Sequence, residues 1–522
     1  MKFFNTAGPV VSEKHYHVPM IARINKEEVL SLIKQEKYFI LHAPRQSGKT
    51  TSLLTLMDIL NKSGEYKCLY VNVESSQVAR ENVEKAMESI LSELEKREKI
   101  YLGEDIISKY VKMSLESSHT ALASILTNWT QESELPTVLF IDEINSLVGD
   151  TLISVLRQLR SSYDTRPEFF PQSIILCGVR DVRDYRIHSS KQKEIITGGS
   201  CFNVKAKSIR LGNFNEKDVR DLYLQHTEET GQEFTEDALK LAYDLTNGQP
   251  WLVNALAYEA CFEMSEGKDR NNPITVDLIN LAKDNIILNR ATHLDQLVDK
   301  LKEERVQNII GPILEGTAIR EIPQDDLQYV IDLGLVSNEK GKIEISNPIY
   351  KEVIPRELNY ITQMSLGSFY EPDWYVATDG SLNVIKFIEN FQEFFRENAE
   401  SWIERFDYKE AGPQLLLQAF LQRVINGGGR IYREYGLGRM RTDILVEWSD
   451  GSKYVLELKI LHKSLEKTIE AGLKQTAEYM DSTGCNIGHL LVFDRSDDKS
   501  WEEKIFRKEK DYNDKQLVIW GM

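Results

Sequence analysis

The chain has 522 residues, of which 41% are hydrophobic and 28% are charged, a composition typical of globular proteins. This length exceeds what one hydrophobic core usually supports, so we expect several domains. The net charge of −17 argues against a protein that coats nucleic acid, and five cysteines without a CxxC pair argue against structural zinc and a disulfide framework. Because no apolar run reaches the ~18 residues of a membrane-spanning helix and residues 1–5 do not resemble a signal peptide, we expect a cytoplasmic protein without a membrane partner.

The first predicted strand, residues 38–41, is a short apolar run that enters a loop of small residues and then a helical pattern. Strand, loop and helix in this order are the context of the phosphate-binding loop GxxxxGK[ST], whose backbone N–H groups bind phosphate oxygens at the helix N-terminus. Lys49 would reach the β- and γ-phosphates, and the Thr50 hydroxyl would bind Mg²⁺. Ala43 stands where the motif has its first glycine, and alanine is the smallest substitute. We therefore predict phosphate contacts from Ala43, Pro44, Arg45, Gln46, Ser47, Gly48, Lys49, Thr50 and Thr51.

The residues before this strand, 1–25, carry aromatic and histidine residues with no clean period. A segment in this position can lie across the base of a nucleotide, with Tyr16, His17 and Arg23 as candidates. His15 and His17 have no nearby cysteine or convincing carboxylate partner, so we do not interpret them as a metal pair.

Strands alternate with helices in the following two hundred residues. The pattern predicts a helix at about 77–97 and further strands at 67–73, 138–142, 173–179 and 208–214. This alternation indicates a parallel sheet covered by helices on both faces.

The strand at 138–142 ends in two carboxylates, Asp142 and Glu143. Asp142 would hold Mg²⁺, directly or through water, and Glu143 is placed to polarise the water that attacks the γ-phosphate. A solvated strand end is the alternative, and the phosphate-binding loop about 90 residues upstream argues against it.

The pattern turns wholly helical from about residue 215 to 289 and contains the turn NGQPWL, in which Pro250 starts a helix. Residues 303–355 then show two short helical segments followed by a β-hairpin, the order of a winged helix. Acidic residues make this module a better candidate for a structural or switching role than for reading DNA: Asp325, Asp326, Asp332 and Glu339.

Residues 1–355 resemble the AAA-like ATPases related to the signal-transduction and archaeal ATPase groups. The resemblance rests on APRQSGKT, LFIDE, CGVR and NGQPW in that order. It implies ATP and Mg²⁺ as cofactors and places the strand that ends at Arg180 between the two motif strands.

The same resemblance implies roles for residues outside the two motifs. Arg180 would be the sensor near the γ-phosphate, with Arg183 in reserve, and the turn at Pro250 would pack against the nucleotide. Arg157 and Arg160 allow two interpretations: an arginine finger acting on a neighbouring subunit of a homo-oligomer, or a salt-bridged helix face.

A second group of candidate catalytic residues follows a turn-rich stretch at 367–380. Glu457 and Lys459 lie two apart in a predicted strand, 454–461, so their side chains project from the same face. Asp443 begins the preceding strand, which a tight turn at 449–451 can make the hairpin neighbour. The two carboxylates can hold Mg²⁺ against a scissile phosphate, while Lys459 orients or deprotonates water.

Asp443 and Glu457-Leu458-Lys459 resemble the motif of the PD-(D/E)XK nuclease superfamily. Gln475 and Tyr479, four apart on one predicted helix face, are similar to the Gln-x-x-x-Tyr motif of its bacterial recombination-nuclease branch. The resemblance implies catalytic roles for all five residues and a site that takes Mg²⁺ or Mn²⁺.

This chain departs from that superfamily in its first helix. Many members carry a metal-binding Glu there, whereas the predicted helix 413–425 has none. Glu410 or Glu434 substitutes, or Gln418 provides a weaker amide ligand.

Local charge supports a nucleic-acid partner. Between residues 423 and 474 there are ten basic against seven acidic residues, a local excess of +3 in an acidic chain. We expect DNA as the substrate, and RNA is the variant to be tested beside it.

The fold class that we predict is α/β multidomain, with a P-loop ATPase and a PD-(D/E)XK nuclease-like domain. The expected parts are residues 1–25 near the nucleotide, a P-loop ATPase core at 26–214, a helical lid at 215–300, a winged helix at 301–360, a linker at 361–380 and the nuclease-like domain at 381–522. The predicted function is an ATPase that controls a Mg²⁺-dependent DNA nuclease, an architecture that suits defence against foreign DNA. The alternative is a nucleotide-dependent switch whose C-terminal fold holds DNA or a protein partner without cutting.

Overall fold

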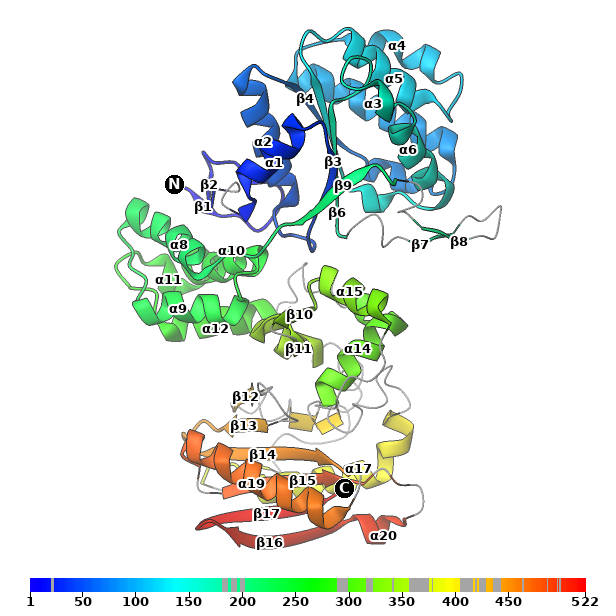
Figure 1. Cartoon of the computed structure of the whole chain (residues 1–522). Coiled ribbons are helices and arrows are strands. Elements are labelled where there is room, and N and C mark those ends of the chain that lie inside the picture. The colour runs from blue at the N-terminus through cyan, green and yellow to red at the C-terminus, as the bar shows by residue number, and fades with distance from the viewer. Residues whose placement is uncertain are drawn as a thin grey trace. The chain divides into compact units, whose positions relative to one another are not determined.

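The protein is described by a computed structural model, and its chain divides into two compact units (Figure 1). One unit comprises Met1–His293 with Gln328–Val336, and the other comprises Leu294–Leu327 with Ser337–Met522. The division cuts through the predicted winged helix, because residues 328–336 pack with the first unit. The structure describes residues 1–522 except 20–22, 181–185, 189–194, 198–201, 289–298, 316–322, 340–341, 356–374, 378, 404–415, 418–419, 422–428, 435–442, 462–463, 486, 495 and 497–498.

A parallel sheet of five strands forms the centre of the first unit, in the order β4-β5-β6-β3-β9. As predicted, β6 separates the two strands that carry the motifs. The strands are β3 (Tyr38–His42), β4 (Lys67–Asn72), β5 (Thr137–Asp142), β6 (Ser173–Gly178) and β9 (Lys205–Arg210).

Two predicted boundaries were wrong. The strand placed at 208–214 is β9, which ends at Arg210 because β3, its pairing partner, ends at His42. The helix placed at 77–97 is a short 3₁₀ turn, η2 (Glu74–Ala79), followed by α3 (Val83–Tyr101). The Asn82 side chain accepts a hydrogen bond from the Lys85 N–H, and this cap starts the helix later than hydrophobic periodicity indicated.

Helices cover both faces of the sheet, and alternate residues of each strand supply the two cores (Figure 1). One core holds Phe39 and Phe140 against α1 (Lys26–Lys34) and α2 (Lys49–Ser63). The other holds Tyr38 and Ile141 against α3 and three further helices: α4 (Ile106–Ser114), α5 (Ala121–Gln131) and α6 (Gly149–Ser161).

Residues 216–288 are helical, as predicted. Two short parallel strands from the N-terminus pack on them, where Phe4 contacts Tyr223 and Phe262 and the Lys2 N–H donates to Glu229. The elements are β1 (Phe3–Phe4), β2 (His15–Tyr16), α8 (Glu216–Thr230), α9 (Glu236–Thr246), α10 (Pro250–Tyr258), the π-helix η6 (Glu259–Glu263), α11 (Ser265–Lys268) and α12 (Val276–Leu288). The first unit also contains a small hairpin, β7 (Arg186–His188) with β8 (Ile195–Thr197), and the turns η3 (Ile144–Ser146) and η4 (Tyr163–Thr165).

Two helices and a two-stranded sheet follow in the predicted order. They are α14 (Glu304–Glu315), α15 (Gln324–Asp332), β10 (Val336–Glu339) and β11 (Lys342–Ile345). The end of α15 contacts the parallel sheet of the first unit, where Arg210 Nη2 donates to the Ile331 carbonyl at 3.1 Å.

A mixed sheet of six strands dominates the second unit, in the order β12-β13-β14-β15-β17-β16. The first three strands are antiparallel neighbours, β14, β15 and β17 are parallel, and β16 is antiparallel to β17. The strands are β12 (Arg430–Glu434), β13 (Asp443–Glu447), β14 (Lys453–Ile460), β15 (Ile487–Phe493), β16 (Phe506–Tyr512) and β17 (Lys515–Gly521).

Helices pack on both faces of this sheet. On one face α19 (Leu465–Thr483) packs Leu473 and Met480 on Val492. On the other, Phe391 of α17 (Val384–Ile403) contacts Phe493. A short helix, α20 (Trp501–Lys504), completes the unit, and the predicted helix 413–425 lies largely outside the described residues.

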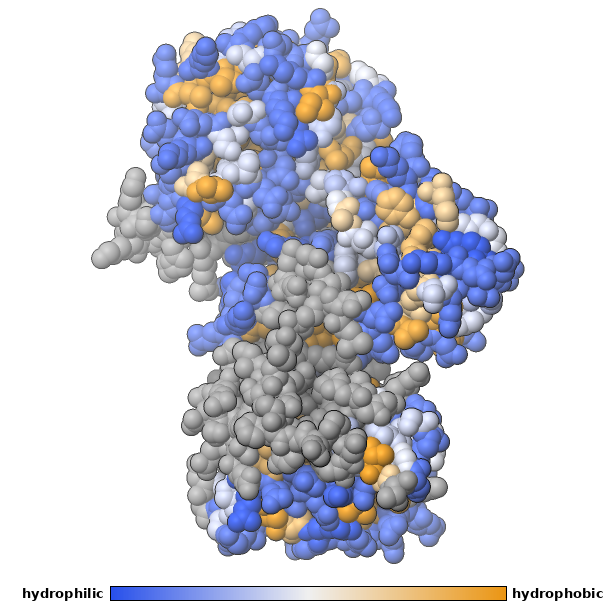
Figure 2. All heavy atoms as spheres, turned by 180° about the vertical axis from the view of Figure 1, so that it is seen from behind, coloured by the Kyte–Doolittle hydropathy of each residue, from blue (hydrophilic) through white to orange (hydrophobic). Residues whose placement is uncertain are grey.

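The surface carries apolar side chains in small patches among hydrophilic ones, as Figure 2 shows for one face. Among the described helices, none combines the length and the apolar character that crossing a membrane demands.

Candidate active sites

The loop between β3 and α2 has the backbone geometry of a phosphate cradle. Gln46 and Gly48 both have positive φ, 54° and 84°, which turns successive N–H groups of the loop inward. Gly48 is the N-cap of α2, and no side chain among the described residues caps this N-terminus. The first N–H groups of α2 and its dipole are therefore placed to bind an anion.

Lys49 is the first residue of α2, and its side chain points back into this loop. Its Nζ donates to the carbonyl oxygens of Ala43 and Pro44 at 3.1 and 2.9 Å. Ala43, which stands in place of the motif glycine, is fully buried and outside the positive-φ region, so its Cβ is tolerated.

Asp142 is the polar centre beside the loop. Its Oδ2 accepts hydrogen bonds from Thr50 Oγ1 at 2.6 Å and from the Tyr70 hydroxyl at 2.9 Å, and its Oδ1 accepts the Glu143 N–H at 2.9 Å. The structure thus brings together the two side chains that sequence reasoning assigned to Mg²⁺. Their hard oxygen donors at one point fit the preference of this ion.

Tyr70 was missed in the sequence because no motif marks it. It points from β4 at Asp142, and burial raises the pKa of the Tyr70 hydroxyl, with the Asp142 charge contributing. The hydroxyl therefore stays protonated and donates.

Glu143 follows Asp142 in a left-handed conformation with φ 57° and ψ 39°. Its Oε2 accepts a hydrogen bond from Asn145 Nδ2 at 3.0 Å. The sensor candidate Arg180 follows β6, and its guanidinium lies 5.0 Å from the centre of the Tyr329 ring. Arg183 lies outside the described residues.

Arg157 and Arg160 are exposed on α6. This placement is compatible with both predicted interpretations of the pair.

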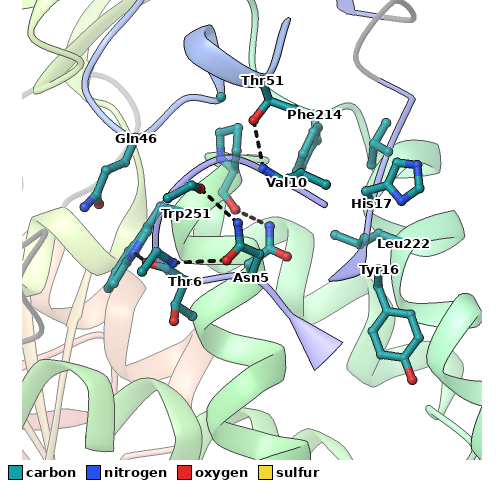
Figure 3. A pocket seen from close by; sticks show the side chains of 16 residues that line it. Asn5, Thr6, Val10, Tyr16, His17, Gln46, Thr51, Phe214, Leu222 and Trp251 are labelled. Atoms are coloured by element: carbon teal, nitrogen blue, oxygen red, sulfur yellow. Dashed lines mark hydrogen bonds between the residues drawn. The ribbon is translucent and has the colours of Figure 1, made fainter. Parts of the chain in front are cut away.

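A pocket of about 110 Å³ adjoins the loop (Figure 3). Thr51 Oγ1 accepts the Val10 N–H at 3.1 Å, and Trp251 Nε1 donates to the Thr6 carbonyl at 2.9 Å, so the N-terminal residues are tied to both α2 and α10. The lining comprises Asn5, Thr6, Ala7, Gly8, Val10, Tyr16, His17, Val18, Gln46, Gly48, Thr51, Phe214, Leu222, Pro250, Trp251 and Asn254.

Two of the three residues that we expected to lie across the nucleotide base line this pocket. Tyr16 and His17 line it, although the Tyr16 ring is buried against Phe4 and His226. Arg23 instead holds the loop, because its guanidinium donates to the carbonyl oxygens of Ser47 and Gly212. Sequence reasoning missed Phe214 and Trp251 as pocket walls; the Trp that follows Pro250 in the turn was the available signal.

A second site lies on the mixed sheet of the other unit. Backbone pairing sets Glu434 opposite Asp443, and Asp443 opposite Glu457, in one row across three strands. The Glu457 side chain is 0% exposed and forms an ion pair with Lys459. Glu434, one of the three substitutes considered for the missing helix Glu, lies in this row by backbone register.

The predicted helical pair lies on α19. Tyr479 is buried in the core between helix and sheet, and Gln475 is half-buried. Glu410 and Gln418 lie outside the described residues, and among those described no three His, Cys, Asp or Glu side chains converge on a metal position.

A family model described as an AAA-like domain matches residues 17–355, which is more than half of the chain. The chain belongs to the AAA-like domain family. Its AAA-like domain contains the phosphate-binding loop, Asp142 and the pocket residues from His17 to Asn254, and is an ATPase domain of the P-loop type.

Solved structures are similar to about two thirds of the chain. The Walker-type ATPase of Pyrococcus abyssi is 14% identical with a TM-score of 0.46, over 67% of this chain and 99% of that one. Cdc6p from Pyrobaculum aerophilum is 14% identical with a TM-score of 0.37, over 67% and 95%. The RuvB Holliday junction branch migration motor of Thermotoga maritima is 12% identical with a TM-score of 0.34, over 64% and 94%. No curated protein sequence matches the chain.

Proposed function

We propose that the AAA-like domain binds and hydrolyses ATP and thereby controls a Mg²⁺-dependent phosphodiesterase in the second unit, which cuts DNA. The observation that carries the second half is the row Glu434, Asp443 and Glu457 with Lys459 beside it. Carboxylates in one row next to an ammonium are the groups that metal-assisted phosphodiester hydrolysis needs.

In the AAA-like domain the loop amides and Lys49 bind the phosphates, and Thr50 with Asp142 holds the cation. The bound Mg²⁺ supplies neutralisation of charge on the phosphate oxygens. Glu143 accepts a proton from the attacking water, and Arg180 offsets charge that develops on the γ-phosphate. The pocket between the N-terminal residues and Trp251 takes the adenine and ribose.

In the second unit Asp443, Glu457 and Glu434 hold the catalytic cation, which is Mg²⁺ or Mn²⁺. Lys459 orients the attacking water and offsets negative charge on the scissile phosphate. Gln475 and Tyr479 support the site from α19. We propose no preference for particular DNA sequences, because contacts to phosphates do not distinguish one base from another.

A second candidate is a nucleotide switch whose C-terminal unit binds DNA or a protein without cutting. The burial of Glu457 and its ion pair with Lys459 favour it, because a buried ion pair can serve structure alone.

The test is cleavage of supercoiled and linear plasmid DNA by full-length protein with Mg²⁺ or Mn²⁺, with and without ATP, beside Asp443→Ala. Equivalent RNA substrates run in parallel. Cutting that disappears in the variant while DNA binding persists supports the nuclease. Absence of cutting under every condition, with ATP turnover intact, supports the switch.

A further inference from the structure

Asn145 connects the Glu143 carboxylate to the end of β6. Its Nδ2 donates to Glu143 Oε2 at 3.0 Å, and its Oδ1 accepts the Val179 N–H at 3.0 Å. Val179 directly precedes the sensor candidate Arg180. One side chain thus bridges the proposed base and the strand end that carries the proposed sensor.

The chemistry of the two partners fixes the orientation of this amide. A backbone N–H can only donate, so the atom that faces Val179 is the amide oxygen of Asn145. The NH₂ group therefore faces Glu143 and donates to its carboxylate.

The backbone of Glu143 is fixed independently of its side chain. Its left-handed φ is sparsely populated by residues other than glycine, and its N–H and carbonyl are bonded to Asp142 Oδ1 and the Ser146 N–H, both at 2.9 Å. Only the side-chain torsion angles of Glu143 are left to vary, and the hydrogen bond from Asn145 restricts them.

We propose that Asn145 is a positioning residue for ATP hydrolysis, which holds the Glu143 carboxylate oriented relative to the end of β6. The inference rests on the proposed function, in which Glu143 is the base. A base has to approach the attacking water within about 2.6–3.2 Å, so a carboxylate that turns freely lowers the rate and leaves nucleotide affinity intact.

The experiment compares Asn145→Asp, Asn145→Ala and Ser146→Ala in the full-length protein. Steady-state ATP hydrolysis gives kcat at one pH near neutrality, and ATP affinity is measured separately. Ser146 is the matched control, because it lies in the same turn and its Oγ donates to the Val73 carbonyl at 3.1 Å.

Asn145→Ala lowers kcat about tenfold, as loss of an outer-shell partner does, while the Kd for ATP stays within about twofold. Asn145→Asp keeps an oxygen that can accept the Val179 N–H but has no N–H group to donate to Glu143, so it lowers kcat to a similar extent. Ser146→Ala leaves kcat close to that of the wild type.

An unchanged kcat in Asn145→Asp or in Asn145→Ala would overturn this role. Because Asn145→Asp is nearly isosteric, its kcat decides the matter if Asn145→Ala does not fold. Glu143→Gln distinguishes the other failure: normal ATP turnover in that variant removes Glu143 as the base and refutes the proposed function itself, whereas trapped ATP leaves only Asn145 in question.

Discussion

Lys49 and Asp142 are charged residues with only 5% and 0% of their surfaces exposed. Burying a charge is costly unless hydrogen bonds replace its water. Asp142 accepts bonds from Thr50, Tyr70 and a backbone amide, and Lys49 donates to two loop carbonyls. These bonds hold the side chains near the positions that phosphate and cation need, so less conformational freedom is lost when ATP binds.

His489 is a buried titratable residue on β15 of the second unit. Its Nδ1 accepts the Trp520 Nε1–H at 3.2 Å. Burial lowers the pKa of His489 to about 3, and the charge of Arg507 adds to the effect. The imidazole is therefore neutral in the folded protein at any pH near neutrality.

Acid should destabilise the second unit through His489. Its folded pKa lies below the unfolded value of about 6.5, so the unfolded chain binds a proton first and stability falls as the pH drops through 6.5 towards 3. Between pH 7.5 and 5 we expect a loss of about 2 kcal/mol that His489→Gln removes. Urea unfolding of the full chain at both pH values measures it. The exposed His119→Gln is the control, and equal acid sensitivity in all three proteins would contradict the prediction.

At the scale of elements, the turn between α9 and α10 positions one wall of the pocket. Gly248 has φ +67°, and a Cβ there would lie 1.8 Å from the Phe214 carbonyl oxygen. The Phe214 N–H donates to the Gly248 carbonyl at 2.9 Å, so a backbone hydrogen bond joins the turn to the segment between β9 and α8. Pro250 then starts α10 and places Trp251 against the N-terminal residues. The glycine of the NGQPW motif is thus required by close backbone approach.

Gly248→Ala should displace this turn. The clash with the Phe214 backbone cannot be relieved by a side-chain rotation, so we expect a destabilisation of about 2 kcal/mol or more and an ATP affinity at least about tenfold lower. Thermal unfolding and nucleotide titration measure these effects.

Gly231→Ala is the matched control for that substitution. It has a similar φ of +77° but open space around its Cβ, so it carries backbone strain of about 1 kcal/mol without a clash. Equal effects of the two substitutions on ATP affinity would show that the close approach at Gly248 is unimportant.

At the scale of the whole molecule, the chain passes between its two units three times. The short segment 328–336 lies at the end of the parallel sheet beside the phosphate-binding loop. An Asp332 oxygen is 4.0 Å from His42 Nδ1, and a Cβ on Gly334 would lie 2.8 Å from Pro44. The second unit resumes at Ser337. The segment that contacts the loop is therefore continuous with the chain that leads into the second unit.

We expect this connection to make DNA cleavage depend on the nucleotide. Lys49→Ala should abolish ATP binding, because the loop loses the positively charged ammonium group that binds the phosphates. It should therefore also remove any effect of ATP on cleavage by the full chain. Asp443→Ala should stop cleavage and leave ATP turnover unchanged. Parallel cleavage and phosphate-release assays on both variants provide the measurement. Cleavage that ignores ATP in the wild type would separate the two activities.

The contiguous sequence determined the chemistry that neighbours along the chain encode. Local patterns located three features: loop 43–48, the pair Asp142 and Glu143, and the strand that holds Glu457 and Lys459. This was possible because strand alternation and loop composition depend on adjacent residues. The order of strands and helices in the first unit, with β6 between the motif strands, was predicted for the same reason and from family resemblance.

The tertiary structure alone decided the contacts between residues distant in sequence. Tyr70 on Asp142, Asn145 between Glu143 and Val179, and Trp251 on Thr6 join positions 72, 34 and 245 residues apart, and each depends on how strands and helices pack. The end of β9 likewise depended on its pairing partner β3, and the start of α3 depended on the Asn82 cap. Hydrophobic periodicity states which face of an element is buried, whereas the partner that meets a given side chain is fixed when the elements assemble.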